Sequence, residues 1–166
     1  MKKPMDLQLF AETLMRAQDS ISGATAKCFV TIGADRYNFM NAISLEASFE
    51  KSKEEVPILG RISKGNKAVG GKGSGSMEVH YNTSIMRKLM IHYMNTGEDF
   101  YFDAQVTNED PTSAAGRQTV ILQDCNLDSS IITQFDADAT YLTESLDFTF
   151  EKVTMPEEFT ILAGML

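Results

Sequence analysis

The sequence contains few of the residues on which metal sites and disulfide scaffolds depend. Its 166 residues include two cysteines, Cys28 and Cys125, and two histidines, His80 and His92. The cysteines show no CxxC spacing and the histidines do not cluster, so the sequence predicts neither a disulfide framework nor a zinc site. Two isolated thiols are typical of a protein made in a reducing compartment.

Long apolar runs are also missing. No stretch approaches the roughly 20 apolar residues that a membrane-spanning helix needs. The start, MKKPMDLQLF, carries two lysines but no sustained apolar segment or small-residue cleavage site, so we expect no signal peptide and no membrane association. The length and a hydrophobic content of 43% predict one soluble globular domain with a real core.

Sequence motifs of enzymes are missing as well. A phosphate-binding loop needs G-x-x-x-x-G-K-[ST], but here Gly71-Lys72 is followed by Gly73, and Asn66 stands where the first glycine should be. The stretch also leads into a strand pattern rather than into a helix whose N-terminus would hold the phosphate. We therefore predict no catalytic site, no cofactor and no metal.

Charge is distributed unevenly along the chain. The net charge of −8 argues against a general binder of nucleic acid or anionic membranes. Residues 51–97 hold eight basic and three acidic side chains, whereas residues 98–151 hold one basic and twelve acidic side chains. A chain with one basic and one acidic region is suited to head-to-tail self-association.

The segment Leu59–Ser76, LGRISKGNKAVGGKGSGS, is the most unusual part of the sequence. It holds six of the 11 glycines and no acidic residue. Glycine frees the backbone, so we predict a long flexible loop that becomes ordered on a partner. The residues assigned to this loop are Leu59, Gly60, Arg61, Lys64, Gly65, Lys67, Gly70, Gly71, Lys72 and Gly73.

Three partners come into question for this loop: a phosphate, a nucleic acid or another protein chain. The failed motif excludes the first. No aromatic residue stands between the cations, so the base stacking of a single-strand binder is missing. Before the glycines lies an apolar segment containing Val56, Pro57 and Ile58, which suggests contact with another subunit. We expect similar contacts for Ile161 and Leu162 near the apolar C-terminus.

The remaining pattern is mostly that of strands. A hairpin is predicted at Ala26–Met40, followed by strands at Ala42–Phe49 and Met77–Tyr81. Four further strands are expected. The one helix, about 83–96, has Ile85, Leu89, His92 and Tyr93 along one apolar face with Met86 and Met90 beside them, and it should end at Gly97. The strands expected after the helix are Phe100–Thr107, Gln118–Leu122, Ile131–Phe135 and Tyr141–Val153.

This arrangement predicts a mainly β protein, an antiparallel β-sandwich or barrel with one flanking α-helix and the long glycine-rich loop. We divide the chain into an N-terminal arm or short helix at 1–20, a β-barrel domain at 21–155 and a C-terminal tail at 156–166. Within the first part, Asp6–Gln18 has helical spacing of its apolar residues.

Four segments carry a resemblance to a known family. The runs FEKSKEEVPILGRISKGNKAVGGKGSGSMEVHY and TSIMRKLMIHYMNTGEDFYF resemble the tail tube proteins of contractile-tailed phages, in the PBSX-like branch. The runs RQTVILQDCNLDSSIITQFDADA and LDFTFEKVTMPEEF extend the match. It covers roughly Leu14 to Phe159 and leaves out the first dozen residues.

The resemblance implies a structural subunit of the virion tail, assembled in the cytoplasm of a bacterial host. Six subunits would close into a ring, and stacked rings would form a hollow tube inside a contractile sheath. Partners would be other copies of the chain, the sheath, the tape measure and the baseplate, with DNA passing through the lumen without specific binding. Leu59–Gly75 would reach an adjacent subunit or the next ring.

Two alternatives stay open. The tube could belong to a tail-like bacteriocin, which carries no genome. In a different class, the chain could be a nucleic-acid-binding module that uses the cations of its glycine-rich loop.

Overall fold

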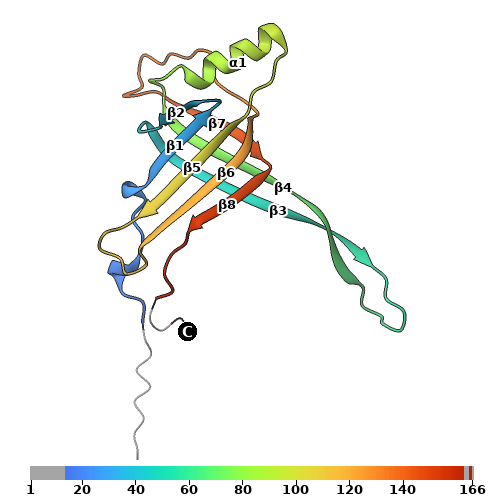
Figure 1. Cartoon of the computed structure of the whole chain (residues 1–166). Helices are drawn as coiled ribbons and strands as arrows, with labels where there is room; N and C mark the ends of the chain where they lie inside the picture. The colour runs from blue at the N-terminus through green and yellow to red at the C-terminus, as the bar shows by residue number, and fades with distance from the viewer. Residues whose placement is uncertain (1–13, 163–164, 166) are drawn as a thin grey trace, which may run out of the picture.

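The computed structural model describes residues 14–162 and 165, and antiparallel β-strands dominate it (Figure 1). Within these residues two 3₁₀ turns, Ala17–Asp19 and Gly23–Thr25, precede eight strands and one α-helix. The mainly β fold and the single flanking α-helix confirm the expected class. The elements are β1 Lys27–Ile32, β2 Asp35–Asn38, β3 Ala42–Val56, β4 Gly65–His80, α1 Ile85–Thr96, β5 Phe102–Glu109, β6 Arg117–Leu127, β7 Thr143–Phe150 and β8 Lys152–Glu157.

The strands form one curled sheet in the order β2-β1-β5-β6-β7-β4-β3, and β8 also pairs with β6. β6 is the corner of this sheet. Its first half, Thr119–Gln123, pairs with β8, and its end, Asn126–Leu127, pairs with β7. At the corner Asp124 has a positive φ of 54°, and the register against β5 shifts by one residue. Such a bulge bends a strand and lets the sheet close over a core.

The core lies on the concave side of this sheet. Met77 from β4 and Leu146 and Phe148 from β7 are fully buried there. Phe102 of β5 meets Phe148 edge to face, with ring centroids 5.8 Å apart, so strands from both sides of the corner share one core. The other buried apolar side chains of this cluster are Val30, Phe39, Val79, Met86, Ala104, Leu122, Cys125, Leu127 and Phe150.

Helix α1 closes one end of the sheet, as Figure 1 shows. It ends where predicted, because Gly97 adopts the left-handed conformation (φ 74°) and donates its N–H to the Tyr93 carbonyl over 2.8 Å. The buried face agrees with the expected one only in part. Met86 is buried and Leu89 and Met90 pack against the core, whereas the His92 side chain is 54% exposed.

Three other expectations differ from the structure. Ile131–Phe135 is irregular, and Phe135 is 92% exposed, so the predicted strand is wrong. Tyr141–Val153 is not one strand but two, β7 and β8, which separate at Glu151 beside the corner of β6. Of Asp6–Gln18, residues up to 13 lie outside the described residues, and the described remainder contains only the start of a 3₁₀ turn.

Candidate assembly surface

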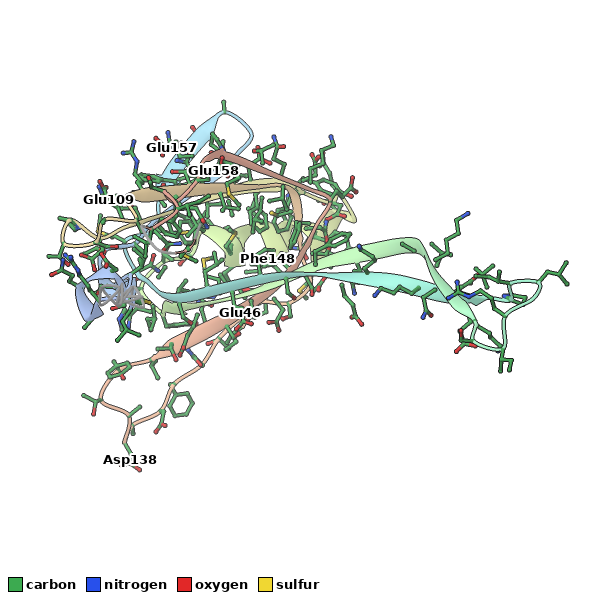
Figure 2. All side chains as sticks on the ribbon, turned by 90° about the horizontal axis from the view of Figure 1, so that it is seen from below. Glu46, Glu109, Asp138, Phe148, Glu157 and Glu158 are labelled. Atoms are coloured by element: carbon green, nitrogen blue, oxygen red, sulfur yellow. The ribbon has the colours of Figure 1, made fainter. Side chains whose placement is uncertain are left out.

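A long hairpin made of β3 and β4 leaves the body of the molecule. The two strands pair from Ala42 opposite Val79 to Val56 opposite Gly65. β7 supports β4 only from Gly73 to His80, so beyond that point the pair continues as a two-stranded ribbon (Figures 1 and 2). We call residues 50–72 the projecting hairpin. The prediction of a flexible loop over Leu59–Ser76 is therefore wrong from Gly65 onward, and only residues 57–64 connect the strands.

Three glycines of β4 serve close packing rather than flexibility. A Cβ atom on Gly73 or Gly75 would lie 2.5 Å from the ring of Phe150 or Phe148, and one on Gly71 would collide with the ring of Phe49. Each ring thus lies directly against the backbone of β4, which only glycine permits. The spacing of two residues follows from the strand, because alternate residues face the same side.

Most of the predicted loop cations face carboxylates within the hairpin. Lys67 is the cross-strand partner of Glu54, and Lys72 is the partner of Glu50. The Lys64 ammonium lies 2.7 Å from the carboxylate of Glu55. Arg61, by contrast, belongs to the connecting turn outside the paired strands. The glutamates of β3 therefore offset most of the positive charge of this segment, which argues against nucleic-acid binding by the hairpin.

The tip of the projecting hairpin carries four exposed apolar side chains. Leu59 and Ile62 are completely exposed, and Val56 and Ile58 are about two-fifths exposed. Gly60 turns the chain here with a φ of 82°. Apolar side chains grouped at the end of a projection mark a contact surface, because leaving them in water is unfavourable.

The sheet around the base of the hairpin has two very different sides. On the core side the register aligns Leu45, Met77 and Leu146 across β3, β4 and β7. On the opposite side, which we call the outer face, it aligns Glu46, Ser76 and Asp147, and Figure 2 shows Glu46 and Phe148 on opposite sides of the ribbon. The outer face contains Ser44, Glu46, Ser48, Ser74, Ser76, Glu78, Ser145, Asp147 and Thr149.

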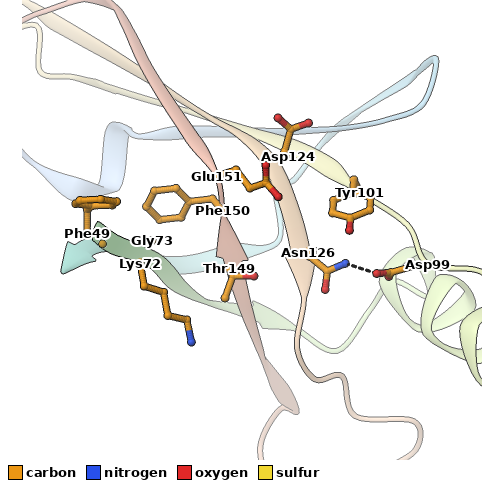
Figure 3. Close-up of a pocket in the computed structure, with 11 residues that line it drawn as sticks. Phe49, Lys72, Gly73, Asp99, Tyr101, Asp124, Asn126, Thr149, Phe150 and Glu151 are labelled. Carbon is orange, nitrogen blue, oxygen red and sulfur yellow. Dashed lines mark hydrogen bonds between the residues drawn. The ribbon is translucent and has the colours of Figure 1, made fainter. Parts of the chain in front are cut away.

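A groove lies where the projecting hairpin meets the body (Figure 3). It has a volume of about 560 Å³, and Phe49 and Tyr101 line it with 61% and 54% of their surfaces exposed. Three carboxylates, from Asp99, Asp124 and Glu151, also line it. The Asn126 amide donates a hydrogen bond to Asp99 over 2.9 Å. We call this site the acidic groove.

The acidic groove was not predicted from the sequence. Asp99 and Tyr101 precede β5, Asp124 forms the bulge of β6, and Glu151 separates β7 from β8. Only the corner of the sheet brings them beside Phe49. The signal available in the sequence was the excess of acids after residue 98, which gives their sign but not their position.

The C-terminal segment is not brought to the hairpin. Thr160 donates its N–H to the carbonyl of Ala115 over 2.8 Å, which ties the segment to the loop between β5 and β6. Ile161, which follows, is 61% exposed, and Leu162 is partly buried. Subunit contact by these two residues stays a prediction.

The described residues offer little for catalysis. Burial raises the pKa of the Cys28 thiol to about 11 and that of the Cys125 thiol to about 12, so both stay protonated and unreactive near neutral pH. No group of three or more metal-binding side chains occurs within residues 14–162. In the same part of the chain, no helix has the length and apolar character needed to cross a membrane.

Comparisons with known proteins agree on one family. A family model described as "Phage tail tube protein" matches residues 13–157. The "Phage-like element PBSX protein XkdM" of Bacillus subtilis (strain 168) is 36% identical over 146 residues, which cover 88% of this chain and 97% of that protein. A second protein of the same organism, YqbM, is 35% identical over 144 residues, covering 87% and 95%.

Solved structures show the same fold at low sequence identity. The SPP1 tail tube superposes with a TM-score of 0.58 at 8% identity, covering 86% of this chain and 81% of that chain. A chain of the sheath–tube complex of the extracellular contractile injection system PVC gives 0.55 at 10% identity, covering 92% and 98%. The extent of the family match and the sequence identity to XkdM together show that the chain belongs to the phage tail tube protein family.

Proposed function

We propose that six copies of this tail tube subunit close into a ring, and that stacked rings form the inner tube of a contractile tail through which DNA passes. The projecting hairpin carries this proposal. It buries little of its surface against its own body, and a two-stranded ribbon of this kind is only marginally stable in water. A neighbouring subunit would supply the surface that orders it, in agreement with the assembly role predicted for Leu59–Gly73.

The outer face suits the lining of a conduit. Its side chains are small hydroxyls and acids, with Glu46, Glu78 and Asp147 on adjacent strands. A polyanion has no cation or aromatic ring to grip on such a surface, and repulsion from the carboxylates keeps it from adhering. DNA would therefore slide along this surface without specific binding. The sheath, the tape measure and the baseplate would contact other faces.

Electron microscopy of the purified protein tests the assembly. We expect negatively stained samples at high concentration to show rings and tubes with a central hole. In a truncated variant, an Asn-Gly turn replaces residues 53–69 and joins Ser52 directly to its partner Gly70. Because the core lies outside this segment, the variant should fold and stay monomeric. Normal tubes from the truncated chain would contradict the role of the hairpin.

Passage of DNA is tested on the assembled tube. Replacing Glu46 and Asp147 with lysine should leave the fold intact, since the Glu46 side chain points away from the core in Figure 2. Tubes of this variant should retain DNA at low salt and release it as salt rises, whereas wild-type tubes retain none. The same retention by both tubes would argue against a lining made of the outer face.

A further inference from the structure

The acidic groove exposes apolar surface that the body itself does not cover. Phe49 is the last ring of a ladder that begins in the core with Phe148 and continues with Phe150. The first two rings are buried, but Phe49, which lies against Gly71, stays 61% exposed. Figure 3 shows Phe49 next to Phe150. Because its ring is held against the β4 backbone, it presents a fixed apolar platform rather than a mobile side chain.

The charges around this platform favour a cationic occupant. Asp99, Asp124 and Glu151 line the groove, and Lys152 lies 3.5 Å from Asp124 and offsets part of its charge. Lys72 also lines the groove, but strand alternation turns its side chain to the other face of β4, opposite Glu50. Asp99 and Glu151, which form none of the ion pairs found among the described residues, therefore leave the groove with a negative charge.

The tip of the projecting hairpin has the complementary chemistry. Arg61 lies between the exposed Leu59 and Ile62, so one short turn offers a guanidinium and two apolar side chains. A guanidinium stacks favourably on an aromatic face and pairs with carboxylates at the same time. Lys64 is less suited to this role because Glu55 already pairs with it.

The tip cannot enter the groove of its own chain. β3 pairs with β4 from Ala42 to Val56, with a register shift between Ser52 and Lys53, and this pairing carries the tip away from the body (Figure 1). A second copy must then supply the occupant. A contact between two different surfaces of identical chains repeats from copy to copy, which is how rings and filaments form.

We propose that the acidic groove binds the hairpin tip of a second copy. Arg61 of that second copy would lie against Phe49 and Tyr101 of the groove and near Glu151. This inference rests on the proposed assembly and identifies the partner surface of the hairpin. The matched charges align the two copies, and burial of Leu59 and Ile62 supplies most of the attraction.

Charge reversal on either side tests the contact. Arg61→Glu and Glu151→Arg should each raise the protein concentration needed for tube formation by at least about tenfold, because each places like charges together. The double variant restores opposite charges and should assemble at close to the wild-type concentration. Lys88→Glu and Asp138→Arg change exposed residues that belong neither to the hairpin nor to the lining of the groove, so they serve as matched controls and should assemble normally.

Cross-linking gives a second measurement that does not depend on assembly strength. Mixed copies carrying Arg61→Cys and Tyr101→Cys should form a disulfide-linked dimer under mild oxidation, whereas Arg61→Cys with Asp138→Cys should not. If wild-type tubes form but both reversed variants assemble like wild type and no dimer appears, the groove is not the acceptor. If the wild type never forms rings or tubes, the proposed function itself fails.

Discussion

Arg87 of α1 and Glu144 of β7 form a nearly buried ion pair in which the guanidinium lies 3.1 Å from the carboxylate. The two side chains are only 13% and 3% exposed. Arg87 also donates a hydrogen bond to the carbonyl of Ile131 over 2.9 Å and lies over the ring of Tyr81, 4.0 Å from its centroid. One arginine thus joins the helix, β7 and the loop at 131–135.

Removing one member of this pair should be strongly destabilising. Arg87→Met leaves the Glu144 carboxylate buried without its cation, and we expect a loss of about 3–5 kcal/mol in the free energy of unfolding. Adding Glu144→Leu should recover much of that loss, because the uncompensated charge disappears. Chemical denaturation of the three variants measures both effects. Equal stability of the single and double variants would contradict the electrostatic explanation.

The glycines of β4 should differ in their tolerance of alanine. In Gly73→Ala and Gly75→Ala the new methyl group meets Phe150 and Phe148, so we expect a loss of about 1–3 kcal/mol in the free energy of unfolding. Gly70 is the matched control, since a Cβ there has no neighbour within 4 Å. Gly70→Ala should be neutral or slightly stabilising. If the three alanine variants had equal free energies of unfolding, close packing would not explain these glycines, and backbone flexibility would be the better explanation.

Attachment of β8 should weaken in acid. The Thr119 hydroxyl donates a hydrogen bond to Glu157 over 2.7 Å, and Arg117 pairs with the same carboxylate. These contacts lower the pKa of Glu157 from its ordinary value of 4.5. A lowered pKa in the folded state means that the carboxylate stabilises the fold above about pH 4.5, and that this contribution is lost as the pH falls through the folded-state pKa.

Thermal unfolding between pH 2 and pH 7 measures this effect. Glu157→Gln should lower the Tm at neutral pH and should approach the wild type at the acidic end of the range, where the wild-type carboxylate is protonated as well. Glu158→Gln is the neighbouring control. A constant Tm difference between Glu157→Gln and the wild type at every pH would show that ionisation of Glu157 does not stabilise β8.

The apolar tip should matter for assembly and not for folding. Leu59→Ser with Ile62→Ser removes side chains that are already fully exposed, so the free energy of unfolding should change by less than about 0.5 kcal/mol. If both are buried between subunits, the concentration for tube formation should rise at least about tenfold. Light scattering during assembly measures that threshold. Met40→Ser, another exposed apolar position outside the hairpin, should leave it unchanged.

Local patterns were sufficient where each segment determines its own conformation. The helix and its end at Gly97 follow from apolar spacing and one left-handed glycine, and the strand start at Ala42 follows from alternation. Alternation also separated Leu45 from Glu46 onto opposite faces. The strand predicted at Ile131–Phe135 was wrong because an apolar run does not reveal whether a partner strand is available. Here the Ile131 carbonyl accepts a hydrogen bond from Arg87 instead.

The sequence by itself determined a mainly β chain with one helix, a basic and an acidic region, and a glycine-rich stretch of unusual composition. Only the tertiary structure decided what that stretch does. Three of its six glycines, Gly71, Gly73 and Gly75, lie under Phe49, Phe150 and Phe148. Phe150 and Phe148 are more than 70 residues away from their glycines in the sequence, so sequence spacing does not reveal why glycine is needed there. Strand pairing likewise places Lys67 opposite Glu54 and leaves Arg61 at the tip. The register of the two strands decides which side chains are neighbours, and local composition does not contain that information.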